Sequence, residues 1–148
     1  MKLENLEKRI KAFEDLEEIK RLHQNYINLM DALEYIKVLD LFTDDCIVEV
    51  RSSGIKRGKK QIEDIYLGIL AKNRGAVRHE GHLAIEPDIT VEGDTAKGTW
   101  LIYMLFSKPS IQWVQGKNEC TYKKVDGVWK IASLKFTRTL ASDPALYP

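Results

Sequence analysis

The sequence predicts an α+β fold in which a strongly curved, mixed or antiparallel sheet is wrapped by about three N-terminal helices around a pocket. Two observations predict it. Apolar residues recur at helical spacing over the first part of the chain, and from about residue 78 onward they alternate with a period of two. A pocket between a curved sheet and its helices is where a small ligand would sit.

The N-terminal helical pattern is the longest in the chain. Apolar side chains step by three and four from Leu3 to Leu33, with charged residues on the other face. This indicates one amphipathic helix, or two helices with a break near Asp15, which could cap the second. Residues 1–12 are interpreted as a helical extension with a narrow stripe suited to a partner: Leu3, Leu6, Ile10 and Phe13. Shorter helices are expected over residues 34–42 and 59–70.

The strands are expected between turn signals. Asp44-Asp45 is interpreted as a turn before the first strand, and Gly93-Asp94 and Asp126-Gly127 are typical of hairpin turns. Residues 141–148 hold two of the four prolines and are expected to form an irregular tail. The expected strands are residues 46–51, 55–58, 78–86, 88–91, 96–106, 111–125 and 128–140.

Composition and charge exclude several classes of protein. The chain has 148 residues, with 23 Lys and Arg against 22 Asp and Glu, so nothing favours nucleic acid or an anionic membrane as partner. It lacks a secretory signal and a stretch of the ~20 apolar residues that a membrane span needs. Two cysteines cannot form a disulfide framework, so a reduced, cytoplasmic location is expected.

Three histidines are available for chemistry. His23 is interpreted as a surface or flanking residue of the long helix. His79 and His82 lie at the start of a predicted strand, where alternation places them on opposite faces. That spacing makes a poor chelate with no third ligand nearby, so no metal site is expected. Motifs for phosphate, dinucleotide or nucleophile chemistry are missing, which favours proton transfer without a cofactor.

Two charged residues interrupt apolar patterns. Asp31, near the end of the long helix, is either a solvent-exposed or capping residue or the partner of a histidine. In the second case it would fix the imidazole tautomer and raise its basicity. Arg138 alternates in phase with apolar residues, so it either reaches out at the sheet edge or binds an anion inside a cavity. Other residues are expected to pack in the core: Trp100, Ile102, Met104, Trp113 and Trp129.

Several spaced motifs together resemble a known family. The chain resembles the SnoaL-like branch of the nuclear-transport-factor-2 superfamily over residues 12–140, which implies a cone-shaped fold and a single domain over residues 1–148. Within that branch it is similar to scytalone dehydratase, bile-acid 7α-dehydratase and hexachlorocyclohexane dehydrochlorinase, which are cofactor-independent lyases. The motifs are Leu22-x3-Tyr26-x4-Asp31, Leu41-Phe42-x-Asp44-Asp45, Gly58-Lys59-x2-Ile62, His79-x2-His82 and Tyr122-x3-Asp126-Gly127-x-Trp129-x-Ile131.

The resemblance implies roles for particular residues. His79 would be the base, Asp31 its orienting partner, and Tyr26 a hydrogen-bond donor to a substrate oxygen. Arg138 falls where the bile-acid enzyme has a pocket arginine, and it is expected to bind substrate together with Val50, Trp100 and Met104. Two of these positions depart from the dehydratases, because Met104 replaces a further acid and Val50 replaces a tyrosine. The pocket would therefore be more apolar.

The expected function is a dehydratase-like elimination on a small hydrophobic, cyclic molecule, with an Asp-His dyad as general base. An isomerase or cyclase using the same base is the first alternative. A non-catalytic ligand-binding or assembly domain is the second, since one fold serves unrelated functions. The resemblance also implies a homo-oligomer, a trimer or a dimer, formed through the sheet.

Overall fold

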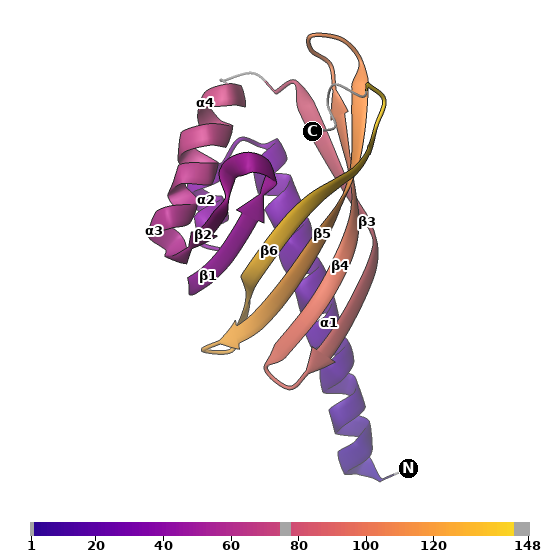
Figure 1. The fold of residues 1–148 in the computed structure, drawn as a ribbon. Helices are drawn as coiled ribbons and strands as arrows, with labels where there is room; N and C mark the ends of the chain where they lie inside the picture. Colours follow the sequence, from indigo (N-terminus) through magenta and orange to yellow (C-terminus); the bar gives the residue numbers. More distant parts are fainter. Residues whose placement is uncertain (1, 75–77, 144–148) are drawn as a thin grey trace.

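The computed structural model describes residues 2–74 and 78–143, which form helices packed on a curved sheet (Figure 1). The helical elements are α1 (Leu3–Asp31), α2 (Tyr35–Leu39), the 3₁₀ turn η1 (Arg51–Ser53), α3 (Gly58–Glu63), the π-helical segment η2 (Asp64–Leu70) and α4 (Ala71–Arg74). The strands are β1 (Phe42–Val50), β2 (Ile55–Arg57), β3 (Glu80–Glu92), β4 (Thr95–Phe106), β5 (Gln112–Val125) and β6 (Val128–Ala141). The predicted α+β class is confirmed.

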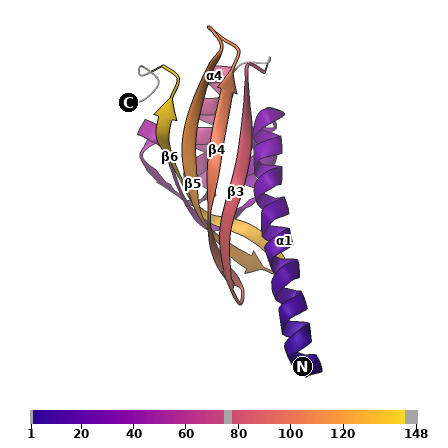
Figure 2. The same cartoon turned by 90° about the vertical axis from the view of Figure 1, so that its right-hand side faces the viewer.

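The described strands form one open, mixed sheet in the order β2-β1-β6-β5-β4-β3. β1 runs parallel to β6, and every other neighbouring pair is antiparallel. The last strand therefore returns beside the first, which places Val50 opposite Phe136. β2 and β3 are the two edges, and the free edge of β3 lies along α1 (Figure 2).

α1 is one continuous helix, so the first of the two alternatives is confirmed and there is no break near Asp15. The Asp15 side chain is buried, where Lys124 Nζ donates to its Oδ1 at 2.6 Å and Trp129 Nε1 donates to the same oxygen at 3.0 Å. Asp15 therefore links α1 to the β5–β6 hairpin and does not cap a second helix. The N-terminal end of α1 projects past the sheet (Figures 1 and 2), and its apolar stripe is exposed: Leu3, Leu6, Ile10 and Phe13.

Two expectations about the strands were wrong, each for a local reason. Asp44 and Asp45 lie within β1, in the stretch where its pairing with β6 is interrupted, so two exposed carboxylates are accommodated without a turn. Residues 78–86 and 88–91 were expected as separate strands, but β3 is one strand with a bulge between Ile85 and Asp88. Pro87 lacks an N–H group, and an edge strand tolerates that loss.

The two hairpin turns were predicted correctly. Asp126 and Gly127 both have positive φ, as the two central residues of a type I′ turn require, and Gly93 also has positive φ. At the other end of β6, the strand includes Ala141, so the tail expected over residues 141–148 starts later than predicted. Residues 144–148 of that tail lie outside the described residues.

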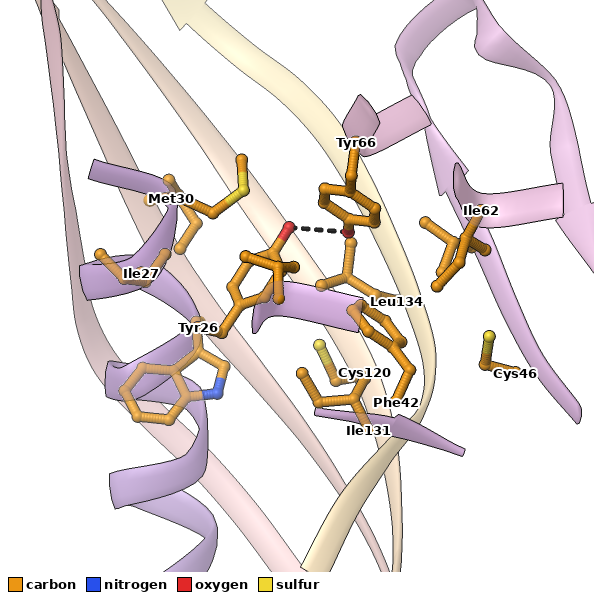
Figure 3. Packing of buried hydrophobic residues seen from close by; sticks show 14 of the residues in the cluster. Tyr26, Ile27, Met30, Phe42, Cys46, Ile62, Tyr66, Cys120, Ile131 and Leu134 are labelled. Atoms are coloured by element: carbon orange, nitrogen blue, oxygen red, sulfur yellow. Dashed lines mark hydrogen bonds between the residues drawn. The ribbon is translucent and has the colours of Figure 1, made fainter. Parts of the chain in front are cut away.

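The hydrophobic core lies between the sheet and the helices (Figure 3). The predicted helix over 59–70 is divided, because η2 has π-helical turns that widen the backbone. Tyr66 of η2 is fully buried and packs against Tyr26 and Phe42. Trp129 is buried as expected, whereas Trp113 was wrongly expected in the core and is 36% exposed on the outer face.

Candidate active site

A cavity of about 780 Å³ opens between α1, η2 and the sheet. This volume lies within the range of small-molecule binding sites. Most of its lining is apolar: Ile27, Met30, Leu33, Val50, Ile65, Ile69, Leu70, Ile102, Met104, Phe106, Pro109, Leu134 and Phe136. Its polar lining is Tyr26, Arg51, Ser53, His79, Glu80, His82, Lys108 and Asn118. A few polar groups on an apolar wall are typical of a site that orients one ligand.

Asp31, the last residue of α1, forms a pair with His82 at the wall of this cavity. His82 Nδ1 lies 2.6 Å from Asp31 Oδ1, and the His82 main-chain N–H donates to both carboxylate oxygens at 3.1 Å. Because the carboxylate accepts the Nδ1 proton, the lone pair of His82 Nε2 is left for another group. The Asp31 side chain is only 14% exposed, and the His82 side chain is only 7% exposed.

The sequence analysis expected His79, and not His82, to pair with Asp31. His79 precedes β3, and its carbonyl oxygen accepts the Ser107 N–H at 2.9 Å. β3 is an edge strand, so the His82 N–H is free to bond the helix carboxylate, and that bond brings the His82 ring to Asp31 as well. The two histidines were also expected on opposite faces, but both line the cavity. His79 lies before β3 begins, so the alternation of side chains between the two faces of a strand does not apply to it.

The electrostatics of Asp31 follow from these contacts. Burial raises the pKa of its carboxyl, but the hydrogen bonds from His82 and the positive charges of His82 and Arg78 outweigh burial and hold it below the ordinary value. Asp31 therefore remains ionised and can stabilise a proton on the imidazole.

Tyr26, expected as a donor to substrate, lines the cavity and its hydroxyl lies 2.9 Å from that of Tyr66 (Figure 3). Burial, together with Tyr26, raises the pKa of Tyr66 well above the usual value, so Tyr66 remains protonated. Tyr66 lies in the helix expected over residues 59–70 and was not among the residues expected at the site. The 40-residue separation gave no local signal of the tyrosine pair.

The remaining residues expected to bind substrate divide into two groups. Val50 and Met104 line the cavity, as the apolar pocket requires. Trp100 and Arg138 are absent from its lining. Trp100 instead stacks on His23, with ring centroids 4.5 Å apart. Arg138 is partly buried, and its pKa is lowered by burial and by the charge of Arg51, a residue of the cavity wall.

His23 was interpreted as a surface residue, and this was wrong, because it is fully buried behind the cavity wall. The Asn118 amide nitrogen lies 3.3 Å from His23 Nε2, and the Tyr122 hydroxyl oxygen lies 3.0 Å from Nδ1. Burial lowers the pKa of His23 to about 3. The helical spacing contained the missed signal: Ile19, His23, Tyr26 and Met30 form one buried stripe.

Neither a metal-binding cluster nor a membrane-spanning helix occurs in the described residues. Residues 2–74 and 78–143 contain no cluster of three or more histidine, cysteine, aspartate or glutamate side chains arranged to hold a metal ion. In the same part of the chain, no helix combines the length and the apolar character needed to cross a bilayer.

An open mixed sheet with helices over an apolar cavity defines the class of cone-shaped α+β proteins. A family model described as a SnoaL-like domain matches residues 11–135, so the chain belongs to the SnoaL-like domain family. The resemblance stated from the sequence motifs is thereby confirmed. No curated protein sequence matches the chain significantly.

Solved structures share this fold over nearly the whole chain. An NTF2-like protein with a cystatin-like fold from Novosphingobium aromaticivorans is 21% identical, with a TM-score of 0.80, over 97% of this chain and 94% of its own. A scytalone dehydratase-like protein from the same species is 21% identical, with a TM-score of 0.77, over 88% of each chain. Hexachlorocyclohexane dehydrochlorinase from Novosphingobium barchaimii is 16% identical, with a TM-score of 0.77, over 90% of this chain and 92% of its own. These likenesses establish the common fold.

Proposed function

We propose that the protein is a cofactor-independent lyase that acts on a small hydrophobic, cyclic molecule. It removes a proton and a neighbouring leaving group, which together form water or another small acid. The observation that carries the proposal is the Asp31–His82 pair on the wall of an apolar cavity. A carboxylate-oriented imidazole in a site of low polarity is a competent general base near neutral pH. Dehydratase and dehydrochlorinase activities among proteins of the same fold support the class of reaction.

In the proposed reaction, His82 Nε2 takes a proton from a carbon next to the bond that breaks. The electron pair of that C–H bond becomes the new carbon–carbon double bond, and the leaving group departs with the electrons of its own bond. Asp31 stabilises the imidazolium, which then returns its proton to the leaving group or to water. The Tyr26 hydroxyl, held by Tyr66, donates a hydrogen bond to the oxygen that gains charge.

An isomerase is the second candidate, and Met104 is the observation that favours it. Met104 lies at the cavity wall where a further acid would assist a leaving group. His82 would then take a proton from one carbon and return it to another carbon of the same molecule. No group would be lost, so a base without a further acid at the Met104 position, directly beside His82 on the neighbouring strand, is sufficient.

The mass of the product separates these reactions. We expect a panel of alicyclic and aromatic compounds with a hydroxyl or chloride next to an acidic C–H bond, hexachlorocyclohexane included, to yield at least one product lighter by the eliminated acid. The reaction is run in D₂O and followed by mass spectrometry. Deuterium uptake without that loss of mass would replace the lyase with the isomerase. Binding without either change would leave a non-catalytic ligand-binding domain.

We also propose a homo-oligomer, a trimer or a dimer, formed through the outer face of the sheet. Leu105 and Trp113 are directly paired across β4 and β5 and are 50% and 36% exposed. Apolar side chains in a contiguous exposed patch are typical of a protein interface. The N-terminal stripe of α1 would extend the contact.

We expect Leu105→Asp to convert this oligomer to a 17.0 kDa monomer in size-exclusion chromatography with light scattering, because a carboxylate cannot be buried there unpaired. Ile36→Asp is the control, since Ile36 is 73% exposed on α2, away from the patch. A wild-type protein that already elutes at 17.0 kDa would contradict the proposal.

A further inference from the structure

A second side chain, Arg78, binds Asp31 in addition to His82. Arg78, just before β3, donates from Nη2 to Asp31 Oδ2 at 3.1 Å and from Nε to the Glu80 carbonyl oxygen at 2.9 Å. One planar guanidinium therefore ties the carboxylate to the start of the strand that carries His82. The Arg78 side chain is 55% exposed, so it covers the buried pair on its solvent side.

Gly81 makes room for this guanidinium. A Cβ atom built on Gly81 would lie 2.8 Å from Arg78 Nη2, which is closer than real Cβ contacts. The Gly81 backbone does not adopt the left-handed conformation that favours glycine. A side chain at position 81 would therefore collide with the Arg78 guanidinium. This lack of space, and not the backbone conformation, explains why a glycine lies between Glu80 and His82.

Building on the proposed role of His82 as the base, we propose that Arg78 is a positioning residue. It fixes the Asp31 carboxylate and partly neutralises the negative charge that this carboxylate presents to His82. The two oxygens of Asp31 meet different side chains: Oδ1 contacts His82 Nδ1, and Oδ2 accepts from the Arg78 guanidinium and from the His82 main-chain N–H. A positive charge on Oδ2 weakens the stabilisation that the carboxylate gives to an imidazolium. Arg78 thereby keeps a larger fraction of His82 neutral, which is the form that accepts a proton.

Other charged or titratable groups surround His82, and none of them replaces this contact. Glu80 Oε2 lies 4.0 Å from His82 Nε2. It favours the protonated ring, opposite in sign to Arg78. The other charged or titratable groups of the cavity wall are Tyr26, Arg51, His79 and Lys108. Arg138 lies outside the lining but interacts with the charges of Arg51 and Glu80. All of them are unchanged in the variants below, so a difference between variants reports Arg78 alone.

The test follows the titration of the His82 imidazole by NMR, in the full chain and without substrate. We expect Arg78→Met to move its midpoint upward, because the variant removes the positive charge beside Asp31 Oδ2 and leaves the carboxylate free to favour an imidazolium. Gly81→Ala, which displaces the guanidinium without removing it, moves the midpoint in the same direction. Arg78→Lys keeps the charge and restores most of the wild-type value. Arg21→Met, an exposed arginine about 15 Å back along α1, is the matched control and changes nothing.

The direction of the shift decides the outcome. If Arg78 only held Asp31 in place, its removal would loosen the carboxylate from the ring and move the midpoint downward. A downward shift or no shift in Arg78→Met would therefore overturn the inference. Because the measurement needs no turnover, it stays informative if the lyase proposal fails. With a substrate from the elimination screen, the acid limb of kcat/KM should follow the same upward shift.

Discussion

Replacing His82 with glutamine lowers kcat/KM by about 10²–10⁴-fold, the contribution typical of a positioned general base. Glutamine fills a similar volume and can donate to Asp31 Oδ1, so the contact with the helix end is kept. What is lost is the basic Nε2 atom that faces the cavity. The Asp31–His82 distance of 2.6 Å shows which imidazole ring the carboxylate contacts.

His79→Gln is the matched comparison, because His79 also lines the cavity but, among the described contacts, its ring makes no hydrogen bond to Asp31. We expect its kcat/KM to stay within a few-fold of the wild-type value. Both variants are measured on the substrate found by the elimination screen, with circular dichroism to check that the fold is retained. The reverse order, with His79→Gln inactive and His82→Gln active, would return the base to His79 and refute the assignment made from the structure.

Local sequence signals were sufficient for most of the fold. The hairpins at Gly93 and Asp126-Gly127 have turn chemistry that few other conformations accept, and the long strands that they join alternate clearly. The position of β6 beside β1, in contrast, joins residues that are far apart in the chain, such as Val50 and Phe136. No local pattern in the sequence predicts that arrangement. It was implied by the resemblance to a family with a cone-shaped fold.

The candidate site was predicted less well, for reasons that differ from residue to residue. From the sequence pattern, Asp31 was either a solvent-exposed or capping residue or the partner of a histidine, and the resemblance implied the second role. The choice of His79 over His82 depended on where β3 begins and on which of its N–H groups is free at the edge. Neither fact is encoded locally. Tyr66 was missed because its partner Tyr26 comes from another element, and packing between elements decides such contacts.

For His23, the helical periodicity was a better guide to burial than the residue type. Its position in the stripe with Ile19 and Tyr26 indicates burial, whereas a histidine alone suggests a surface. Asn118 donates to Nε2, so the neutral ring carries its proton on Nδ1 and donates to the Tyr122 oxygen, which also accepts the Trp100 N–H at 2.9 Å. Every polar atom of the ring is thus engaged, and a second ring proton would have no acceptor.

Acid should therefore destabilise the protein through His23 at pH values where carboxylates are still ionised. The unfolded chain protonates this residue near its ordinary pKa of 6.5, but the folded chain does so only at a pKa of about 3. Below 6.5 the unfolded state binds a proton that the folded state excludes, so the free energy of unfolding falls with pH until about 3. By pH 4.5 the loss from this one group is roughly 2–3 kcal/mol.

His23→Gln removes this dependence. Urea unfolding between pH 7 and pH 4.5 should give a variant that is less stable than wild type at pH 7 but whose free energy of unfolding falls less steeply with acid. His79→Gln, which alters a partly exposed histidine, should keep the steep wild-type slope. The range stops above pH 4 because the carboxyl groups of Asp15 and Asp31, whose pKa values are lowered in the fold, lose their own contribution below it. Equal slopes in wild type and His23→Gln would mean that the buried ring accepts a proton without unfolding the chain, and the hydrogen-bond assignment around it would then be wrong.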